Sequence, residues 1–321
     1  MPLTEFELIE RYFRDSGARR SDVIAGIGDD AALLAVAPEA ELVAATDTLV
    51  AGVHFPLGSP AASIGHRALA VNLSDLAAMG ARPAWALLAL TIPDADEAWL
   101  AEFAAGLGTL ARAHHVALVG GDTTRGPLTV TVQLLGHVPR GEALRRSGGR
   151  AGDALFVSGT PGDAAAGLAL EQGRLSAPPD ALTYLRERFL LPTPRMALGE
   201  RLRSHASACI DVSDGLLGDA GKLAQASHTG VEISFAALPV SEPLTRAAGG
   251  EPARMLALTG GDDYELLFAV HPEKVAGMLA ELPPDRWGYS RIGALRAAPG
   301  AVVVREGTVM QFSHSGYQHF A

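Results

Sequence analysis

Residues 41–50 read ELVAATDTLV, a strand-like run bounded by turns, and a second run of this kind, LLALTIP, follows at residues 87–93. Between the two runs, the stretch from Ser63 to Met79 is compatible with one long helix. Strands that alternate with long helices are typical of an α/β chain. Three more expected elements extend the pattern, namely a helix over about residues 97–115 and strands at VALVGGD (116–122) and LTVTVQLLGHV (128–138).

A polar, glycine-rich stretch without periodicity, PRGEALRRSGGRAGD at residues 139–153, is typical of a linker. We therefore expect two domains, residues 1–140 and residues 141–321. The second half repeats the alternation of strands and helices. Its expected elements are a strand at 154–159, a helix at 163–173, a strand, turn and helix over 208–227, and a helix end or strand, glycine turn and strand over 254–270.

The overall composition limits the classes of protein to consider. A chain of 321 residues with 48% hydrophobic content can bury the cores of two domains. Cys209 is the single cysteine, the start of the sequence does not resemble a leader peptide, and no run approaches the ~20 apolar residues of a membrane helix. The net charge of −10 and the lack of a basic run disfavour nucleic acid as a partner. We expect a cytoplasmic protein with no membrane or nucleic-acid partner.

Aspartates recur at glycine turns beside strand-like sequence. Each one alone could be an ordinary turn or helix N-cap residue. As a set they are expected to crowd at strand ends, where carboxylates raise one another's pKa unless cations neutralise them. Oxygen ligands and a lone cysteine favour Mg²⁺ over zinc. The set comprises Asp29, Asp30, Asp47, Asp122, Asp211, Asp214, Asp262 and Asp263.

Two further features bear on phosphate chemistry. Asp75 interrupts the apolar face of the expected helix, with Asn72 on the same side, so this carboxylate needs a partner. Carboxylates that hold Mg²⁺ are suited to phosphoryl transfer, although no P-loop, protein-kinase or dinucleotide motif is present. The stretch VSGTPGDAAAGLAL (157–170) could cradle a phosphate at a helix start or could be only a turn.

Taken in order, these motifs resemble the thiamine-monophosphate kinase family, within the ATP-binding superfamily that includes aminoimidazole ribonucleotide synthetase, selenophosphate synthetase and a hydrogenase maturation protein. The resemblance runs from about residue 3 to residue 320. It rests on GIGDDAAL (26–33), ATDTLVAGVHF (45–55), NLSDLAAMGARP (72–83), VGGDTTRG (119–126), RSGGRAGD (146–153), IDVSDGL (210–216), GGDDYELLF (260–268) and SGYQHF (315–320).

The resemblance implies a fold, a reaction and an assembly. The expected fold is a two-domain α/β protein of the α+β type, like aminoimidazole ribonucleotide synthetase, with an N-terminal ATP- and Mg²⁺-binding domain that also dimerises. The expected reaction is direct in-line transfer of the γ-phosphoryl group of ATP to thiamine monophosphate, with several Mg²⁺ ions and no phosphoenzyme. We expect a homodimer with ATP near the dimer and domain interface.

The resemblance also implies residue roles. Asp47, Asp122 and Asp211 are expected to be catalytic. The expected metal ligands are Asp30, Thr46, Asp47, Asp75, Asp122, Asp211 and Asp214, with Asp29 a neighbour of uncertain role; the expected ATP contacts are Gly121, Asp122, Arg146 and Ser213; and the expected acceptor contacts are His54 for the phosphate and Glu265 and Tyr317 for the rings.

Two positions depart from the family pattern, because Asp262 stands where glutamate is usual and Tyr317 where tryptophan is common. Two alternatives stay open. The chain could be another ATP-dependent enzyme of the superfamily, although it has no reactive cysteine near its start and no cysteine at its end, or it could be a non-catalytic Mg²⁺–nucleotide-binding protein. The presence of His54, Glu265 and Tyr317 favours catalysis.

Overall fold

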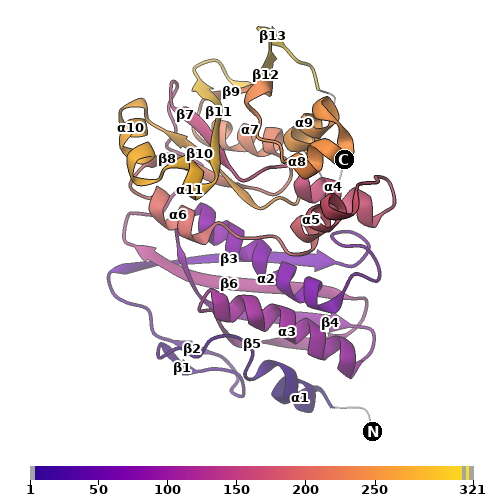
Figure 1. Cartoon of the computed structure of the whole chain (residues 1–321). Helices are drawn as coiled ribbons and strands as arrows, with labels where there is room; N and C mark the ends of the chain where they lie inside the picture. Colours follow the sequence, from indigo (N-terminus) through magenta and orange to yellow (C-terminus); the bar gives the residue numbers. More distant parts are fainter. Residues whose placement is uncertain (1–3, 313–315, 318–321) are drawn as a thin grey trace. The chain divides into compact units, whose positions relative to one another are not determined.

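The computed structural model describes residues 4–312 and 316–317. The chain divides into two compact units, Met1–Leu76 with Ala81–Glu142, and Ala77–Gly80 with Ala143–Ala321. Among the described residues, every helix is too short or too polar to span a bilayer. Figure 1 shows the elements of both units by label.

The first unit is built on a four-stranded sheet in the order β3-β6-β4-β5. Only the β4–β5 pair is parallel, because a helix connects these two strands. The elements of this unit are α1 (Glu5–Leu8), the π-helix η1 (Ile9–Phe13), β1 (Val23–Ala25), β2 (Leu33–Leu34), β3 (Ala40–Val50), α2 (Ala61–Ala78, whose last two residues group with the second unit), β4 (Arg82–Ile92), α3 (Glu97–Ala113), β5 (Ala117–Arg125) and β6 (Thr129–Pro139).

The four-stranded sheet has one covered and one open face. In Figure 1, helices α2 and α3 lie in front of this sheet. Val130, Val132 and Leu134 of β6 are buried, whereas the alternate residue Gln133 is exposed. Because side chains alternate along a strand, the register of each pair tells which face a residue occupies.

Two glycines let α2 and α3 approach each other closely. A Cβ at Gly65 would lie 2.2 Å from the carbonyl oxygen of Phe103, and one at Gly106 would lie 1.9 Å from that of Ala62. Helix α3 begins at an aspartate cap, since Asp96 accepts the backbone N–H groups of the residues two and three positions later. The close crossing keeps both helices on the same face of the sheet.

The second unit is built on a seven-stranded sheet in the order β13-β12-β9-β11-β7-β10-β8. Its pairs are antiparallel except β9–β12. The elements are β7 (Ala154–Ser158), α4 (Asp163–Glu171), α5 (Pro179–Leu190), α6 (Met196–Leu202), β8 (Ala206–Val212), α7 (Leu216–Ala226), β9 (Gly230–Ser234), η2 (Phe235–Ala237), α8 (Glu242–Ala248), α9 (Gly250–Thr259), β10 (Glu265–Val270), α10 (Pro272–Glu281), α11 (Pro284–Trp287), β11 (Tyr289–Arg296), β12 (Gly300–Arg305) and β13 (Thr308–Val309).

Different side chains fill the two faces of the seven-stranded sheet. On one face, strand residues such as Ile210 and Leu267 pack with Leu217 and Leu223 of α7 in one buried cluster. On the other face, the rings of Phe156 and Phe268 stack at 5.5 Å between centroids, and Tyr289 meets both edge-on. The sheet is thus covered on both sides, and strands β8 and β10 are largely buried.

The α/β prediction is confirmed, and the expected strands and helices are present. The strand expected at 87–93 begins earlier, at Arg82, because Arg82, Pro83 and Trp85 also pair with β6. The stretch 254–270, left open between helix and strand at its start, is a helix to Thr259 and a strand from Glu265. Of the expected closing motif at 315–320, only Gly316 and Tyr317 lie within the described residues.

Candidate active site

Two of the expected catalytic carboxylates lie on opposite faces of the sheet in the first unit. Asp47 of β3 pairs with the buried Val132 and is half-buried on the face covered by helices. Asp122 of β5 pairs with the exposed Ala89 and lies on the open face. Threonine hydroxyls line the same open face, where Oγ1 of Thr48 and Oγ1 of Thr131 lie 2.8 Å apart.

The strand order separates these carboxylates further. Strands β3 and β5 are the two edges of the sheet, three strand spacings or about 14 Å apart. Across the described ranges, no group of three or more His, Cys, Asp or Glu side chains is placed to hold a metal ion. The expected crowding of Asp47 and Asp122 within one sheet is therefore not observed, because strand pairing sets both their face and their spacing.

The remaining expected residues of the first unit occupy loops, a strand and helix α2. Asp29 and Asp30 are exposed between β1 and β2, and Thr46 lies on the open face, where its hydroxyl donates to the carbonyl of Val132. Asp75 is half-buried on α2. His54 lies in the turn after β3, and its Nδ1 accepts the N–H of Val50 at 3.0 Å.

Gly121 is an expected ATP contact whose backbone requires glycine. Its φ is +149°, and a Cβ there would lie 1.8 Å from the carbonyl oxygen of Leu88 on the neighbouring strand. Any side chain would push β5 away from β4, so Gly121 fixes the close pairing that carries Asp122.

In the second unit, the turn after β8 gathers several expected residues. Asp211 lies in the buried part of β8 and is 5% exposed, and Ser213 and Asp214 follow the last strand residue, Val212, in the turn before α7. The carbonyl of Asp214 accepts the N–H of Tyr317 at 2.9 Å, which places Tyr317 beside this turn. Tyr317 is half-exposed, and its backbone is bonded to Asp214, an expected metal ligand.

The loop between α9 and β10 lies against the same turn. Asp262 donates its N–H to the carbonyl of Ser213, and Tyr264 donates its N–H to that of Val212, both at 2.8 Å. Both residues have a left-handed backbone conformation, with φ of 71° for Asp262 and 52° for Tyr264. Such conformations are unfavourable for a non-glycine residue and gather at functional sites. Asp262 is half-buried, and its backbone N–H joins this loop to Ser213.

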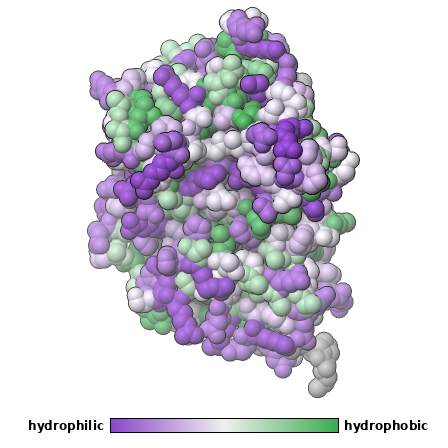
Figure 2. All heavy atoms as spheres, in the orientation of Figure 1, coloured by the Kyte–Doolittle hydropathy of each residue, from purple (hydrophilic) through white to green (hydrophobic). Residues whose placement is uncertain are grey.

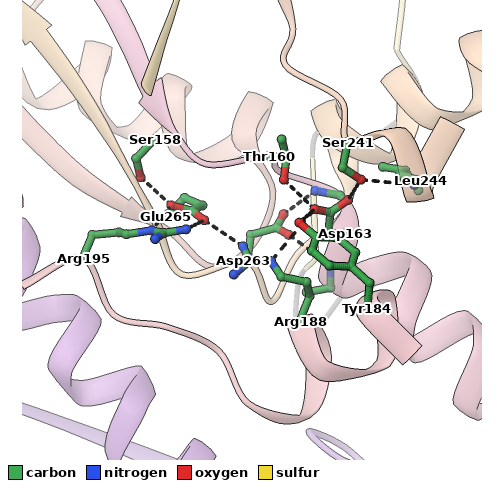
Figure 3. A network of polar contacts seen from close by, with 12 residues as sticks. Ser158, Thr160, Asp163, Tyr184, Arg188, Arg195, Ser241, Leu244, Asp263 and Glu265 are labelled. Carbon is green, nitrogen blue, oxygen red and sulfur yellow. Dashed lines mark hydrogen bonds and ion pairs between the residues drawn. The ribbon is translucent and has the colours of Figure 1, made fainter. Parts of the chain in front are cut away.

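Glu265 occupies a different environment from the one that the resemblance implies. Its side chain is 0% exposed, and Arg195 forms two hydrogen bonds to the carboxylate, both at 2.6 Å. Arg188 and Ser158 donate to it at 2.7 and 2.5 Å (Figure 3). Burial raises the pKa of Glu265, but the hydrogen bonds and charges of the arginines outweigh burial and hold it below its ordinary value. This carboxylate faces inward to protein donors, so in this structure it orients two arginines and offers no oxygen to an acceptor ring.

A second buried acid, Asp263, bonds to the glycine-rich stretch 157–170, which was expected to form either a phosphate cradle or only a turn. The carboxylate of Asp263 accepts the N–H of Gly162 at 2.7 Å and that of Ala164 at 3.2 Å, at the start of α4. Burial raises the pKa of Asp263 well above its ordinary value. These two N–H groups already have a carboxylate partner, so they form no open phosphate cradle.

Four residues of the second unit were missed by sequence reasoning. Arg188 and Arg195 come from α5 and from the loop before α6, and nothing in the sequence pairs them with Glu265. Asp219 and Lys222 lie on α7 behind the Ser213–Asp214 turn. A signal for Asp219 existed, since this acid sits among the apolar residues of α7. Arg146, an expected ATP contact, is exposed in the loop before β7, and its carbonyl accepts from Ser227 at 2.8 Å.

Comparison with known proteins identifies the family of the chain. The N-terminal domain of AIR synthase related protein matches residues 28–138, and the C-terminal domain of that family matches residues 150–305. The thiamine-monophosphate kinase of Escherichia coli (strain K12) is 48% identical over 325 residues, which cover 100% of this chain and 99% of that protein.

Solved structures give the same result. The thiamine-monophosphate kinase of Stenotrophomonas maltophilia K279a is 46% identical, with a TM-score of 0.87 over 96% of this chain and 99% of that chain. AaThiL, solved in complex with AMPPCP and TMP, is 32% identical, with a TM-score of 0.78 over 89% of each chain. The chain therefore belongs to the thiamine-monophosphate kinase family and consists of the two domains of AIR synthase related proteins.

Proposed function

We propose that this protein transfers the γ-phosphoryl group of ATP to the phosphate of thiamine monophosphate, giving thiamine diphosphate and ADP. The observation that carries the proposal is the full-length identity of 48% to a thiamine-monophosphate kinase. The relative in complex with AMPPCP and TMP supports ATP and thiamine monophosphate as the two substrates. The absence of an established nucleophile motif favours direct in-line transfer without a phosphoenzyme.

We further propose that Mg²⁺ ions bind the expected carboxylates, all of which are exposed or half-buried except the buried Asp211. The donors are all oxygen atoms, which suits a hard cation. Because Asp47 and Asp122 occupy opposite faces and edges of one sheet, the donor set of a single subunit fits more than one ion. When bound, the ions neutralise charge on the phosphate oxygens. The proposed metal ligands are Asp30, Thr46, Asp47, Asp75, Asp122, Asp211 and Asp214.

The chain's other residues would bind and orient the substrates. Gly121, Arg146 and Ser213 are proposed ATP contacts, together with Asp122. His54 is a proposed contact for the acceptor phosphate and Tyr317 for its rings. Since Glu265 is fully buried, we assign it an indirect role in the acceptor site, through the arginines that it binds. Asp262 is the half-buried carboxylate of the loop between α9 and β10.

We propose a homodimer formed through the open face of the β3-β6-β4-β5 sheet. Leu42 is 51% exposed on this face, and the neighbouring side chains are mostly small residues and threonines, such as Ala44, Ala89 and Thr48. Figure 2 is drawn from the side on which α2 and α3 cover the sheet. On this covered side, apolar residues form only small, separate groups. A second copy is the occupant proposed for the opposite, open face, where two such sheets can pack.

The domain roles and location follow from the same proposal. Residues 1–140 would supply metal, ATP and dimer contacts, and residues 141–321 would complete the nucleotide and acceptor sites. A biosynthetic kinase with one buried, unpaired thiol, Cys209, fits the cytoplasm.

The deciding experiment incubates the purified protein with ATP, Mg²⁺ and thiamine monophosphate, oxidises thiamine compounds to their thiochromes, and measures the diphosphate by fluorescence after chromatographic separation from the monophosphate. Product should form, and it should be absent when thiamine replaces the monophosphate. Asp47→Asn, which removes a ligand charge, should lower turnover severely at saturating Mg²⁺. Nucleotide binding without any product would instead indicate a non-catalytic nucleotide-binding protein.

A further inference from the structure

Asp219, in the first turn of α7, is a buried acid with no part in the function described above. Its side chain is 1% exposed. Its Oδ2 accepts the backbone N–H groups of Ser213 and Asp214, both at 3.0 Å. Asp219 therefore fixes the two consecutive peptide groups that carry a proposed ATP contact and a proposed metal ligand.

Lys222, one turn further along α7, joins the same group of contacts. Its Nζ donates to Oδ1 of Asp219 at 2.8 Å and to Oδ2 of Asp214 at 2.5 Å. The Lys222 side chain is 44% exposed, whereas that of Asp219 is almost completely buried. Of the 26 basic residues in the chain only Lys222 and Lys274 are lysines, so the residue at this turn departs from the chain's strong preference for arginine.

The local backbone explains why the turn needs this support. Gly215, which precedes α7, has a φ of +125° and provides no side-chain cap. The carboxylate of Asp219 satisfies N–H groups of the turn from inside the helix, where an ordinary cap residue would act from outside. Nζ of Lys222 contacts the other carboxylate oxygen, Oδ1, so Oδ2 is left to accept both N–H groups of the turn.

We propose that Asp219 and Lys222 are positioning residues that hold the Ser213–Asp214 turn in the geometry needed for Mg²⁺–ATP. The proposal rests on the proposed function, which assigns Ser213 to the nucleotide and Asp214 to a cation. Asp219 sets the backbone of the turn, and Lys222 sets the direction of the Asp214 carboxylate. Neither side chain need touch the substrate.

A simpler role for Lys222 makes the opposite prediction. If Lys222 were only a counter-ion of Asp214, its removal would leave more negative charge and tighten the binding of Mg²⁺. If Lys222 positions the carboxylate, its removal loosens the turn and weakens the binding of Mg²⁺–nucleotide. Residues that orient metal ligands typically change affinity or activity by about 10- to 100-fold.

The experiment compares Lys222→Met, Lys222→Arg and Asp219→Asn in the full chain, with Lys274→Met as the matched control. Lys274 is on α10, where its Nζ donates to the carbonyl of Ser204. Calorimetry measures the Kd of the β,γ-methylene analogue of ATP at fixed Mg²⁺, steady-state kinetics measure KM for ATP and for thiamine monophosphate, and thermal unfolding reports stability.

We expect Kd and the KM for ATP to rise about tenfold in Lys222→Met and about 10- to 100-fold in Asp219→Asn. The KM for thiamine monophosphate should stay within twofold. Lys222→Arg should restore most of the affinity because it keeps the charge, and Lys274→Met should match the wild type.

Unchanged or tighter nucleotide binding in Lys222→Met would overturn the proposal, and so would an equal rise in both KM values together with a lower Tm. If Asp219→Asn does not fold, the half-exposed Lys222 decides the outcome. A wild-type protein that binds the analogue but forms no thiamine diphosphate refutes the proposed function and leaves the binding test of the turn intact. A wild-type protein that does not bind the analogue overturns both.

Discussion

Replacing Glu265 with glutamine tests whether this carboxylate stabilises the fold or contacts the acceptor. Glu265→Gln keeps the shape and an acceptor for Ser158 but removes the charge shared by Arg188 and Arg195. Removing one partner of a buried ion pair typically costs about 3–5 kcal/mol, because an uncompensated charge is left behind.

The structure places the expected loss at the low end of that range. The side chain of Arg195 is 30% exposed and can be hydrated, and Nε of Arg188 still lies 3.9 Å from Asp163. We therefore expect about 3 kcal/mol, which corresponds to a fall of roughly 6–12 °C in Tm for a domain of this size.

Urea and thermal unfolding of wild type and variant measure this loss. Glu242→Gln is the matched control, because its side chain is 75% exposed and its partner Arg246 lies 3.5 Å away at the surface. A double variant, Glu265→Gln with Arg195→Met, should lose less than the sum of the two single variants, since it removes one of the unpaired charges.

The pH dependence has a definite sign. The folded-state pKa of Glu265 is below its ordinary value, so its stabilisation is present above the unfolded-state pKa of about 4.3 and is lost as the pH falls through the folded value. The difference in unfolding free energy between wild type and Glu265→Gln should therefore shrink below about pH 4.

One result would refute this account of Glu265. If the variant kept wild-type stability within about 1 kcal/mol, well under the cost of breaking a buried pair, while its KM for thiamine monophosphate rose, Glu265 would contact the acceptor as the resemblance implies. The buried arrangement with two arginines would then not describe the working enzyme.

Two further predictions concern the acceptor site and the thiol. Tyr317→Ala should raise the KM for thiamine monophosphate about 2- to 13-fold through lost stacking and leave the KM for ATP nearly unchanged. Tyr317→Trp should bind thiamine monophosphate at least as well as the wild type. Equal changes in both KM values would show that Tyr317 has only a packing role. Burial raises the pKa of the Cys209 thiol, so iodoacetamide at pH 8 should modify Cys209 only after denaturation, and rapid labelling of the native protein would contradict its position in β8.

The fold was largely predictable because its signals are local. The strands β3 and β6 and the helices α2 and α3 each carry their own hydrophobic pattern, and the polar stretch 139–153 precedes β7. The strand order was not predictable, since the pairing of β9 with β12 depends on contacts between segments far apart in the sequence. In the four-stranded sheet, the separation of Asp47 from Asp122 follows from the order β3-β6-β4-β5 and from the face that each residue occupies, which no local pattern encodes.

In the candidate site, the environment of each carboxylate could not be predicted from the sequence either. In the sequence, Asp122, Asp262 and Asp263 are alike, because each follows a glycine or another acid at a turn. In the structure, Asp263 is fully buried and accepts N–H groups at the start of α4, whereas Asp122 is exposed and Asp262 half-buried.

Bonds to protein donors in the interior distinguish the structural acids Asp263 and Glu265 from exposed candidate ligands such as Asp122. A carboxylate that already accepts from N–H or guanidinium groups in the interior must break those bonds before it can bind a cation, as for Asp263 and Glu265. An exposed carboxylate such as Asp122 needs to give up only bound water when it binds a cation. Asp214 lies between these cases, half-buried and bonded to Lys222, so cation binding at that residue must accommodate an ammonium group already in place. The proposed cation site at this turn therefore has a lysine beside it that the aspartate-rich motif at residues 211–214 does not predict.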